Sequence, residues 1–126
     1  MSKPDIMSMD ITPLIEDGTN IITSYGSDNI AVNEEKFEKN IIVSEKNVKN
    51  YENAFSLIED VKSENISTIL IFGCNDEVKR SEFKNISKLG LKDGKTFEIM
   101  NLGAACRTFN VLVSEGRNVI AVLVLK

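Results

Sequence analysis

The sequence predicts an α/β protein: a single three-layer domain in which helices pack on a mixed β-sheet whose N-terminal part is antiparallel. Two patterns support this prediction. Short β-rich runs separated by turn residues occupy the first third of the chain, and helical periodicity then alternates with apolar, strand-like runs. The length of 126 residues, with 42% hydrophobic and 27% charged residues, is typical of one globular domain. We assign residues 1–13 to a flexible N-terminal lead-in and residues 14–126 to the domain.

The opening third is predicted to form antiparallel strands. The lead-in has no clear hydrophobic period and contains Pro4 and Pro13. Three short runs rich in β-forming residues predict strands over residues 21–25, 30–32 and 40–43. The Gly-Ser-Asp-Asn cluster at residues 26–29 predicts a turn, so the first two strands form a hairpin. Residues 33–36 are polar and are expected to be a connection.

The rest of the chain is predicted to alternate helices and strands. Apolar residues at helical spacing predict helices over residues 51–61, 77–89 and 103–115. Apolar runs predict strands over residues 67–72, 96–100 and 118–125. The first of these strands is expected to be buried on both faces, and the last, which is the most hydrophobic, to be central. In the second helix, the residues expected to face the core are Val78, Phe83, Ile86 and Leu89. Gly90 and Gly116 are expected to end the second and third helices.

Composition argues against several classes of function. The absence of histidine removes the serine–histidine and cysteine–histidine triads and His-ligated zinc. A net charge of -4, from 15 basic and 19 acidic residues, argues against nucleic-acid binding and against docking on anionic membranes. No apolar run is long enough to span a bilayer, and we do not expect the first 13 residues to be a secretory signal or a mitochondrial presequence. Cys74 and Cys106 form neither a C-x-x-C motif nor an obvious disulfide framework. We therefore expect a cytoplasmic protein with free thiols and with no cofactor or bound metal.

Residues 100–117 carry the most information about function. On a helical wheel, one wide apolar face is formed by Ala105, Cys106, Phe109, Leu112 and Val113. A narrow polar stripe on the opposite side is formed by Arg107, Asn110, Ser114 and Arg117. The stripe is either a solvated face or a binding surface. Arginine offers a planar fork that lysine lacks, and Arg107 lies at the helix end where the macrodipole disfavours a cation. This placement indicates specific partners, within the fold or in another protein.

The start of this helix combines the small residues Gly103, Ala104 and Ala105. Small side chains permit close approach of the backbone, and free N–H groups at a helix start favour anions. Cys106 lies in the first turn beside Arg107, where the helix dipole and the positive charge lower a thiol pKa. Three interpretations are open: close packing with a core thiol, an anion or ligand site, and a reactive thiol that lacks a histidine base. The loops at residues 73–76 and 101–105 would share one rim beyond the strand ends, where Cys74 could approach Cys106.

Residues 103–112, GAACRTFNVL, and residues 114–117, SEGR, resemble the signature of the mitochondrial complex I assembly factor three family. That family also includes the adipogenesis-associated domain protein and small bacterial and archaeal proteins. The strand end at residues 69–73 and the run at 21–25 are similar to its other landmarks, so the resemblance spans about residues 20–125. The sequence departs from the family pattern at Leu102, where threonine is usual, at Asn75, where glycine is usual, and at Phe109, where tyrosine is common.

The resemblance implies a compact three-layer α/β fold and, for the mitochondrial members, a non-catalytic role in assembling respiratory NADH:ubiquinone oxidoreductase. For this chain it implies a non-enzymatic interaction factor whose protein partners are complex I subunits or other assembly factors. The polar stripe defined above is the expected working surface. The alternative, from the residues themselves, is a small-molecule or anion-binding protein, or an enzyme, that uses residues 103–105 with Arg107 and Cys106.

Overall fold

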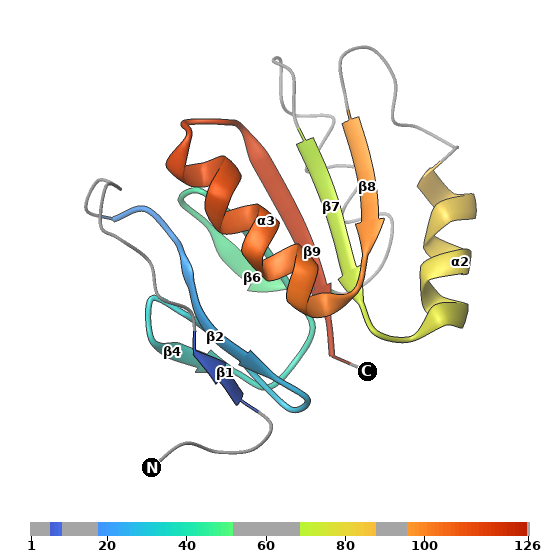
Figure 1. Ribbon diagram of the computed structural model, residues 1–126, viewed down its shortest axis with the longest axis horizontal. Helices are drawn as coiled ribbons and strands as arrows, with labels where there is room; N and C mark the ends of the chain where they lie inside the picture. The colour runs from blue at the N-terminus through green and yellow to red at the C-terminus, as the bar shows by residue number, and fades with distance from the viewer. Residues whose placement is uncertain (1–5, 9–17, 52–68, 88–95, 126) are drawn as a thin grey trace.

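The computed structural model describes residues 6–8, 18–51, 69–87 and 96–125, and two β-sheets form the framework of this part (Figure 1). The first sheet is antiparallel, with the strand order β1-β2-β3-β4. Its strands are β1 (Ile6–Ser8), β2 (Ile22–Gly26), β3 (Ile30–Val32) and β4 (Glu35–Phe37). The predicted hairpin at residues 21–32 is confirmed as β2 and β3. Strand β1 lies within the segment expected to be a lead-in, so residues 6–8 belong to a sheet.

The second sheet has five strands in the order β6-β5-β9-β7-β8. Its strands are β5 (Ile41–Ser44), β6 (Val48–Asn50), β7 (Ile69–Cys74), β8 (Thr96–Met100) and β9 (Val119–Val124). Strand β7 is parallel to β8 and β9, whereas β5 is antiparallel to β9 and β6. The predicted central position of the last strand is confirmed, and every residue of β9 is buried. The α/β fold class is therefore confirmed, although the strands divide between two sheets instead of forming one.

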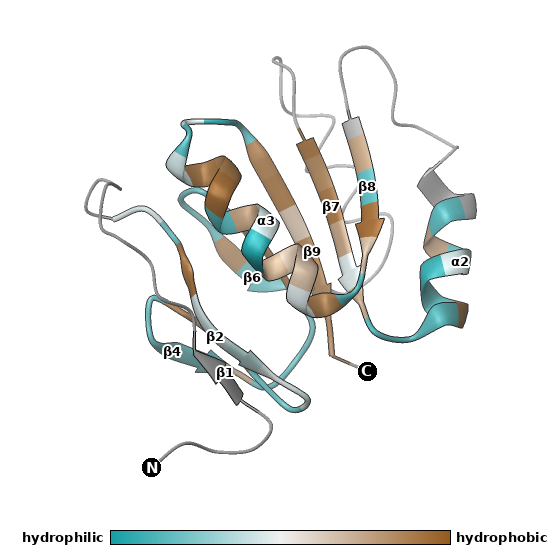
Figure 2. Ribbon diagram, viewed as in Figure 1, coloured by the Kyte–Doolittle hydropathy of each residue, from teal (hydrophilic) through white to brown (hydrophobic). Residues whose placement is uncertain are grey.

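In the described part of the chain, two helices cover opposite faces of the five-stranded sheet (Figure 1). Helix α3 (Leu102–Ser114) packs on β7 and β9 and also contacts β2 of the antiparallel sheet, while α2 (Glu77–Ser87) packs on β7 and β8. In β9, Ala121 and Leu123 join the core cluster that contains α3, whereas Val122 and Val124 join the cluster of Phe83 from α2. Figure 2 shows β7 and β9 as largely hydrophobic strands, whereas α2 is mainly hydrophilic.

Strands β4 and β6 are not recognisable in the sequence pattern. Glu35 and Lys36 were expected to continue a polar connection, but they begin an exposed strand at the edge of its sheet. The connection between β3 and β4 is only two residues long, because Asn33 and Glu34 both have positive φ, at 51° and 72°. Such a turn matches the twist of antiparallel strands. Strand β6 is equally short and largely exposed, so it carries no apolar alternation.

Helix α2 begins after Asp76, whose Oδ1 accepts hydrogen bonds from the backbone N–H groups of Val78 (2.8 Å) and Lys79 (3.1 Å). Phe83 faces the core as predicted and is 4% exposed. The inward orientation predicted for Val78 is wrong, because this side chain is 67% exposed. At about 100° per residue, Val78 lies roughly 140° around the helix from Phe83, so both cannot face the same sheet.

Some expectations fall outside the described residues. The predicted helix over residues 51–61 is not described beyond residue 51, and the side chain at position 86 and all of residues 88–95 are likewise not described. Within the described ranges, no helix is both long enough and apolar enough to cross a membrane.

Candidate functional site

Three of the first four backbone N–H groups of α3 donate hydrogen bonds inside the protein. Asn101 caps the helix: its Oδ1 accepts a hydrogen bond from the N–H of Ala104 at 2.9 Å. The N–H of Leu102 donates to Oδ1 of Asn75 at 3.0 Å, and the N–H of Ala105 donates to the carbonyl of Asn101 at 3.0 Å. The bond from Leu102 to Asn75 confirms that the loops after β7 and β8 share one rim. Because the Leu102 N–H is already bonded to Asn75, it is not free to bind an anion at the helix start.

Small residues at this rim allow three elements to meet closely. A Cβ at Gly73 would overlap the Cβ of Ala105 and lie 3.2 Å from Cδ2 of Leu123, so β7 and the first turn of α3 approach each other closely there. A Cβ at Gly103 would lie 2.8 Å from the hydroxyl oxygen of Tyr25. The ring of Tyr25, from β2, therefore covers the first turn of α3. The geometry favours the packing interpretation of residues 103–105 over an anion site.

Asn110 is not a surface residue, and its placement on the polar stripe is a wrong prediction. Its side chain is 3% exposed and faces β2. The Oδ1 of Asn110 accepts a hydrogen bond from the N–H of Ile22 at 2.8 Å, and its Nδ2 donates to the Ile22 carbonyl at 2.8 Å. The amide thus pairs with the backbone of β2 as a neighbouring strand would. Asn110 joins helix and antiparallel sheet across 88 positions of sequence.

Cys106 is not an activated thiol, which overturns the expectation that the helix start lowers its pKa. The residue has no exposed surface, and burial raises the pKa of its thiol from 9.0 to about 12, against the opposing charge of Arg107. Cys74 and Cys106 are both free. Cys106 belongs to the core cluster on the α3 face of the sheet and Cys74 to the cluster on the α2 face. The suggested approach of the two thiols is therefore wrong, because the sheet separates them.

The exposed surface of α3 is formed by Arg107, Val111 and Ser114, and Tyr25 adjoins it; we call these four residues the α3 outer face. Arg107 is exposed, and its Nη1 donates a hydrogen bond to the Tyr25 hydroxyl at 2.7 Å. Val111 is 53% exposed, four residues after Arg107. The Ser114 hydroxyl donates to the carbonyl of Val111 at 2.7 Å. Arg117 is exposed just beyond the helix.

Sequence reasoning missed both Tyr25 and Val111 as surface residues of interest. The signal that could have found Val111 is its position four residues after Arg107, which places an apolar side chain beside the polar stripe on the same side of the helix. Tyr25 could not be found, because its contact with Arg107 joins positions 82 apart in sequence.

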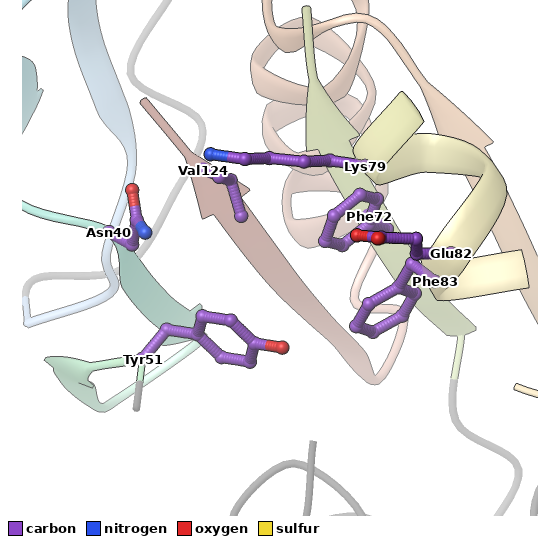
Figure 3. Close-up of a pocket in the computed structure, with 7 residues that line it drawn as sticks. All are labelled: Asn40, Tyr51, Phe72, Lys79, Glu82, Phe83 and Val124. Atoms are coloured by element: carbon purple, nitrogen blue, oxygen red, sulfur yellow. The ribbon is translucent and has the colours of Figure 1, made fainter. Parts of the chain in front are cut away.

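A second feature missed in the sequence is a pocket of about 210 Å³ on the α2 side of the five-stranded sheet (Figure 3). It lies between α2, the ends of β7 and β9, and the β5–β6 hairpin. Its lining comprises Asn40, Tyr51, Phe72, Lys79, Glu82, Phe83 and Val124. None of these belongs to the 100–117 segment, and they come from five separate places along the chain.

Comparison with known proteins identifies the family. The profile of the family described as "Protein of unknown function (DUF498/DUF598)" matches residues 22–124. The chain belongs to the DUF498/DUF598 family. The matched residues run from the first residue of β2 to the last residue of β9 and contain the whole of α3. No curated protein matches the sequence significantly.

Solved structures share the fold of this DUF498/DUF598 member. A solution structure of a Bordetella pertussis protein, described as a Mth938-like domain, is similar with a TM-score of 0.60 and 20% identity, covering 94% of this chain and 92% of that one. A Xanthomonas campestris protein matches with a TM-score of 0.59, 21% identity and the same coverage, 94% and 92%. A protein from Bartonella henselae, described as an outer membrane protein, matches with a TM-score of 0.58 and 23% identity over 85% of this chain and 95% of that one. At these identities the likeness establishes the fold alone.

Proposed function

We propose that this protein is a non-enzymatic interaction factor that binds a protein partner through the α3 outer face. The observation that carries the proposal is that Val111, an aliphatic side chain, is 53% exposed on a helix whose opposite face lies in the core. Tyr25 and Arg107 lie on the same surface. Tyrosine and arginine are the residue types that dominate binding energy at protein interfaces.

The buried residues of the 100–117 segment already have structural roles. Asn110 bonds to β2, Gly103 makes room for Tyr25, and Cys106 lies in the core. Of the residues singled out in the sequence, Arg107, Ser114 and Arg117 are exposed. A requirement for binding, in addition to packing, would account for an exposed aliphatic side chain at Val111 on the same surface as Arg107 and Tyr25.

The α3 outer face is also ordered before any partner binds. The hydrogen bond between Arg107 and Tyr25 fixes two flexible side chains against each other. Fixing side chains in advance reduces the entropy lost on association, by about 0.5–1.5 kcal/mol for each side chain. A preordered surface that pairs an aliphatic centre with a guanidinium suits a partner with an apolar residue flanked by carboxylates.

The partner class follows from the resemblance at residues 103–117. We propose that the partners are subunits of respiratory complex I or its other assembly factors, and that the protein meets them in the cytoplasm. The high pKa of the Cys106 thiol supports a binding role over thiol catalysis, since a protonated and buried thiol is a poor nucleophile.

The proposal is tested by affinity capture from the native cell with four forms of the protein. Wild-type protein should retain complex I subunits or assembly factors. A double variant, Arg107→Ala with Arg117→Ala, and the single variant Val111→Glu should each lose at least nine-tenths of them. Val78→Glu is the matched control, because Val78 is also an exposed valine on a helix. If both test variants retain every partner that wild-type protein captures, the α3 outer face is not the binding surface.

A further inference from the structure

We propose that the pocket between α2 and the β5–β6 hairpin binds a small zwitterion, namely a free α-amino acid with an apolar side chain. The site lies on the α2 face of the five-stranded sheet, opposite the face that α3 covers. It therefore stands independently of the function proposed for the α3 outer face.

The apolar part of the pocket is aromatic and rigid. Phe72 from β7 and Phe83 from α2 both line it, and their rings stack with centroids 3.9 Å apart and an interplanar angle of 11°. Phe97 continues the stack behind Phe83, with centroids 5.3 Å apart. Val124, at the end of β9, adds an aliphatic surface. These groups form a rigid apolar floor. Because Phe72, Phe83 and Val124 are each no more than 5% exposed, only a small part of that floor can contact a ligand side chain.

One charge of each sign lies on the same pocket wall. Lys79 and Glu82 are three residues apart on α2. Figure 3 shows Lys79 extending from that helix toward Val124, while the shorter Glu82 side chain lies beside Phe72 and Phe83. Among the described residues, neither charge has an ion-pair partner. A ligand that carries a carboxylate and an ammonium would pair with both, whereas a simple anion would meet the Glu82 carboxylate as a like charge.

The opposite wall presents neutral polar groups in fixed orientations. The Oδ1 of Asn40 accepts a hydrogen bond from the N–H of Leu125 at 2.7 Å, and the Asn40 carbonyl accepts from the N–H of Tyr51 at 2.9 Å. With Oδ1 engaged, the group that Asn40 can offer to the pocket is its NH₂ donor. The Tyr51 hydroxyl also extends toward the pocket (Figure 3), and burial raises the pKa of Tyr51, so this group stays a neutral donor. Two donors facing Lys79 across the pocket suit a carboxylate.

The size of the pocket limits the ligand. Its volume of about 210 Å³ is below the roughly 300–1,000 Å³ of pockets that hold drug-sized molecules. A single amino acid fits this scale, and a nucleotide or a peptide does not. The combination of two opposite charges, neutral donors and an aromatic floor in so small a space selects an apolar amino acid from other small metabolites.

The test is titration of the full-length protein with L-leucine, followed by NMR chemical shifts and by thermal unfolding, since a ligand that binds the native state raises its stability. Saturable binding at millimolar or lower concentration is expected. Three probes each lack one feature: 4-methylpentanoate has no ammonium, 3-methylbutylamine has no carboxylate, and glycine has no side chain. Each should bind at least tenfold more weakly than leucine.

Variants locate the binding. Lys79→Gln and Glu82→Gln should each weaken leucine binding at least tenfold. Glu77→Gln, on the exposed first turn of α2, and Lys36→Gln, on β4, remove the same charges outside the pocket and should leave binding unchanged. Absence of saturable binding at 20 mM leucine would overturn the proposal. Equal binding of 4-methylpentanoate, or unchanged affinity in both pocket variants, would overturn it as well.

Discussion

Replacing Asn110 with aspartate tests how the antiparallel sheet is held to the rest of the molecule. The Asn110 amide makes two hydrogen bonds of 2.8 Å to the backbone of Ile22 and is 3% exposed. Asn110→Asp preserves the size of the side chain and the acceptor for the Ile22 N–H. It replaces the donor to the Ile22 carbonyl with an oxygen, which then faces another oxygen in a buried position.

The expected cost at neutral pH follows from these contacts. A buried carbonyl left without a donor costs about 1–3 kcal/mol, and an unpaired buried charge raises the total to about 3–5 kcal/mol. Domains of this size are stable by about 5–15 kcal/mol, so the variant should fold with reduced stability.

The cost should also depend on pH. Burial and the facing carbonyl raise the pKa of the introduced carboxyl above its value in the unfolded chain. Protonation restores the donor, so the carboxyl supports folding at low pH, and this support is lost as pH rises through the folded-state pKa. The free energy of unfolding should therefore fall with rising pH by up to about 1.4 kcal/mol per unit, relative to wild type.

The assay is urea unfolding of wild type, Asn110→Asp and Asn110→Ala between pH 5.5 and pH 8. The alanine variant leaves both Ile22 groups without partners and should lose about 2–6 kcal/mol. It carries no carboxyl, so its loss should be the same at every pH. The reasoning is refuted if Asn110→Asp matches wild-type stability, or if its pH profile is the same as that of Asn110→Ala.

Three further predictions follow from close contacts, backbone conformation and burial. Gly73→Ala should cost at least about 2 kcal/mol in urea unfolding, because its new methyl meets the Cβ of Ala105. Gly103→Ala should cost under about 1 kcal/mol, because its new methyl meets the Tyr25 ring, which can shift at the loss of one exposed hydrogen bond to Arg107; equal costs would contradict the packing at the rim. Glu34→Gly should raise the free energy of unfolding by about 0.5–1 kcal/mol, since glycine adopts the positive φ of 72° without strain; an unchanged urea midpoint would contradict this. Cys106 should be alkylated at pH 7 only as fast as the protein opens, and rapid labelling of the native protein would contradict this by showing an accessible thiolate. Because burial raises the pKa of this thiol from 9.0 to about 12, the neutral thiol stabilises the fold below pH 9, and this contribution is lost as pH rises towards 12.

The strands and helices that could be predicted are those with a strong burial signal. Strands β7 and β9 are continuous apolar runs, and α3 has a wide apolar face bounded by Gly116, whose φ of 76° ends the helix. Strands β4 and β6 have three residues each and are mostly exposed, so hydrophobic periodicity contains no information about them. The division into two sheets depends on which strands pair, and a single sequence does not encode that in its periodicity.

The candidate site was predicted only in part, because a helical wheel assumes one buried direction. At about 100° per residue, Asn110 lies roughly 60° from Arg107 and roughly 100° from Phe109, on the border between the two faces. Strand β2 packs on that border, so Asn110 is buried while Val111, on the other flank, is exposed. The pocket beside α2 was not predictable, because Lys79 and Asn40 are brought together only by the order of the strands.

Site-specific photocrosslinking in the native cell tests the central claim most directly, namely that the α3 outer face is the working surface. A benzophenone amino acid placed at Val111, and separately at Val78 as the control, reports which proteins lie within contact distance of each exposed valine. The account predicts a discrete adduct with a complex I subunit or assembly factor at position 111 and none at position 78. No adduct at position 111, or the same adducts at both positions, would contradict it.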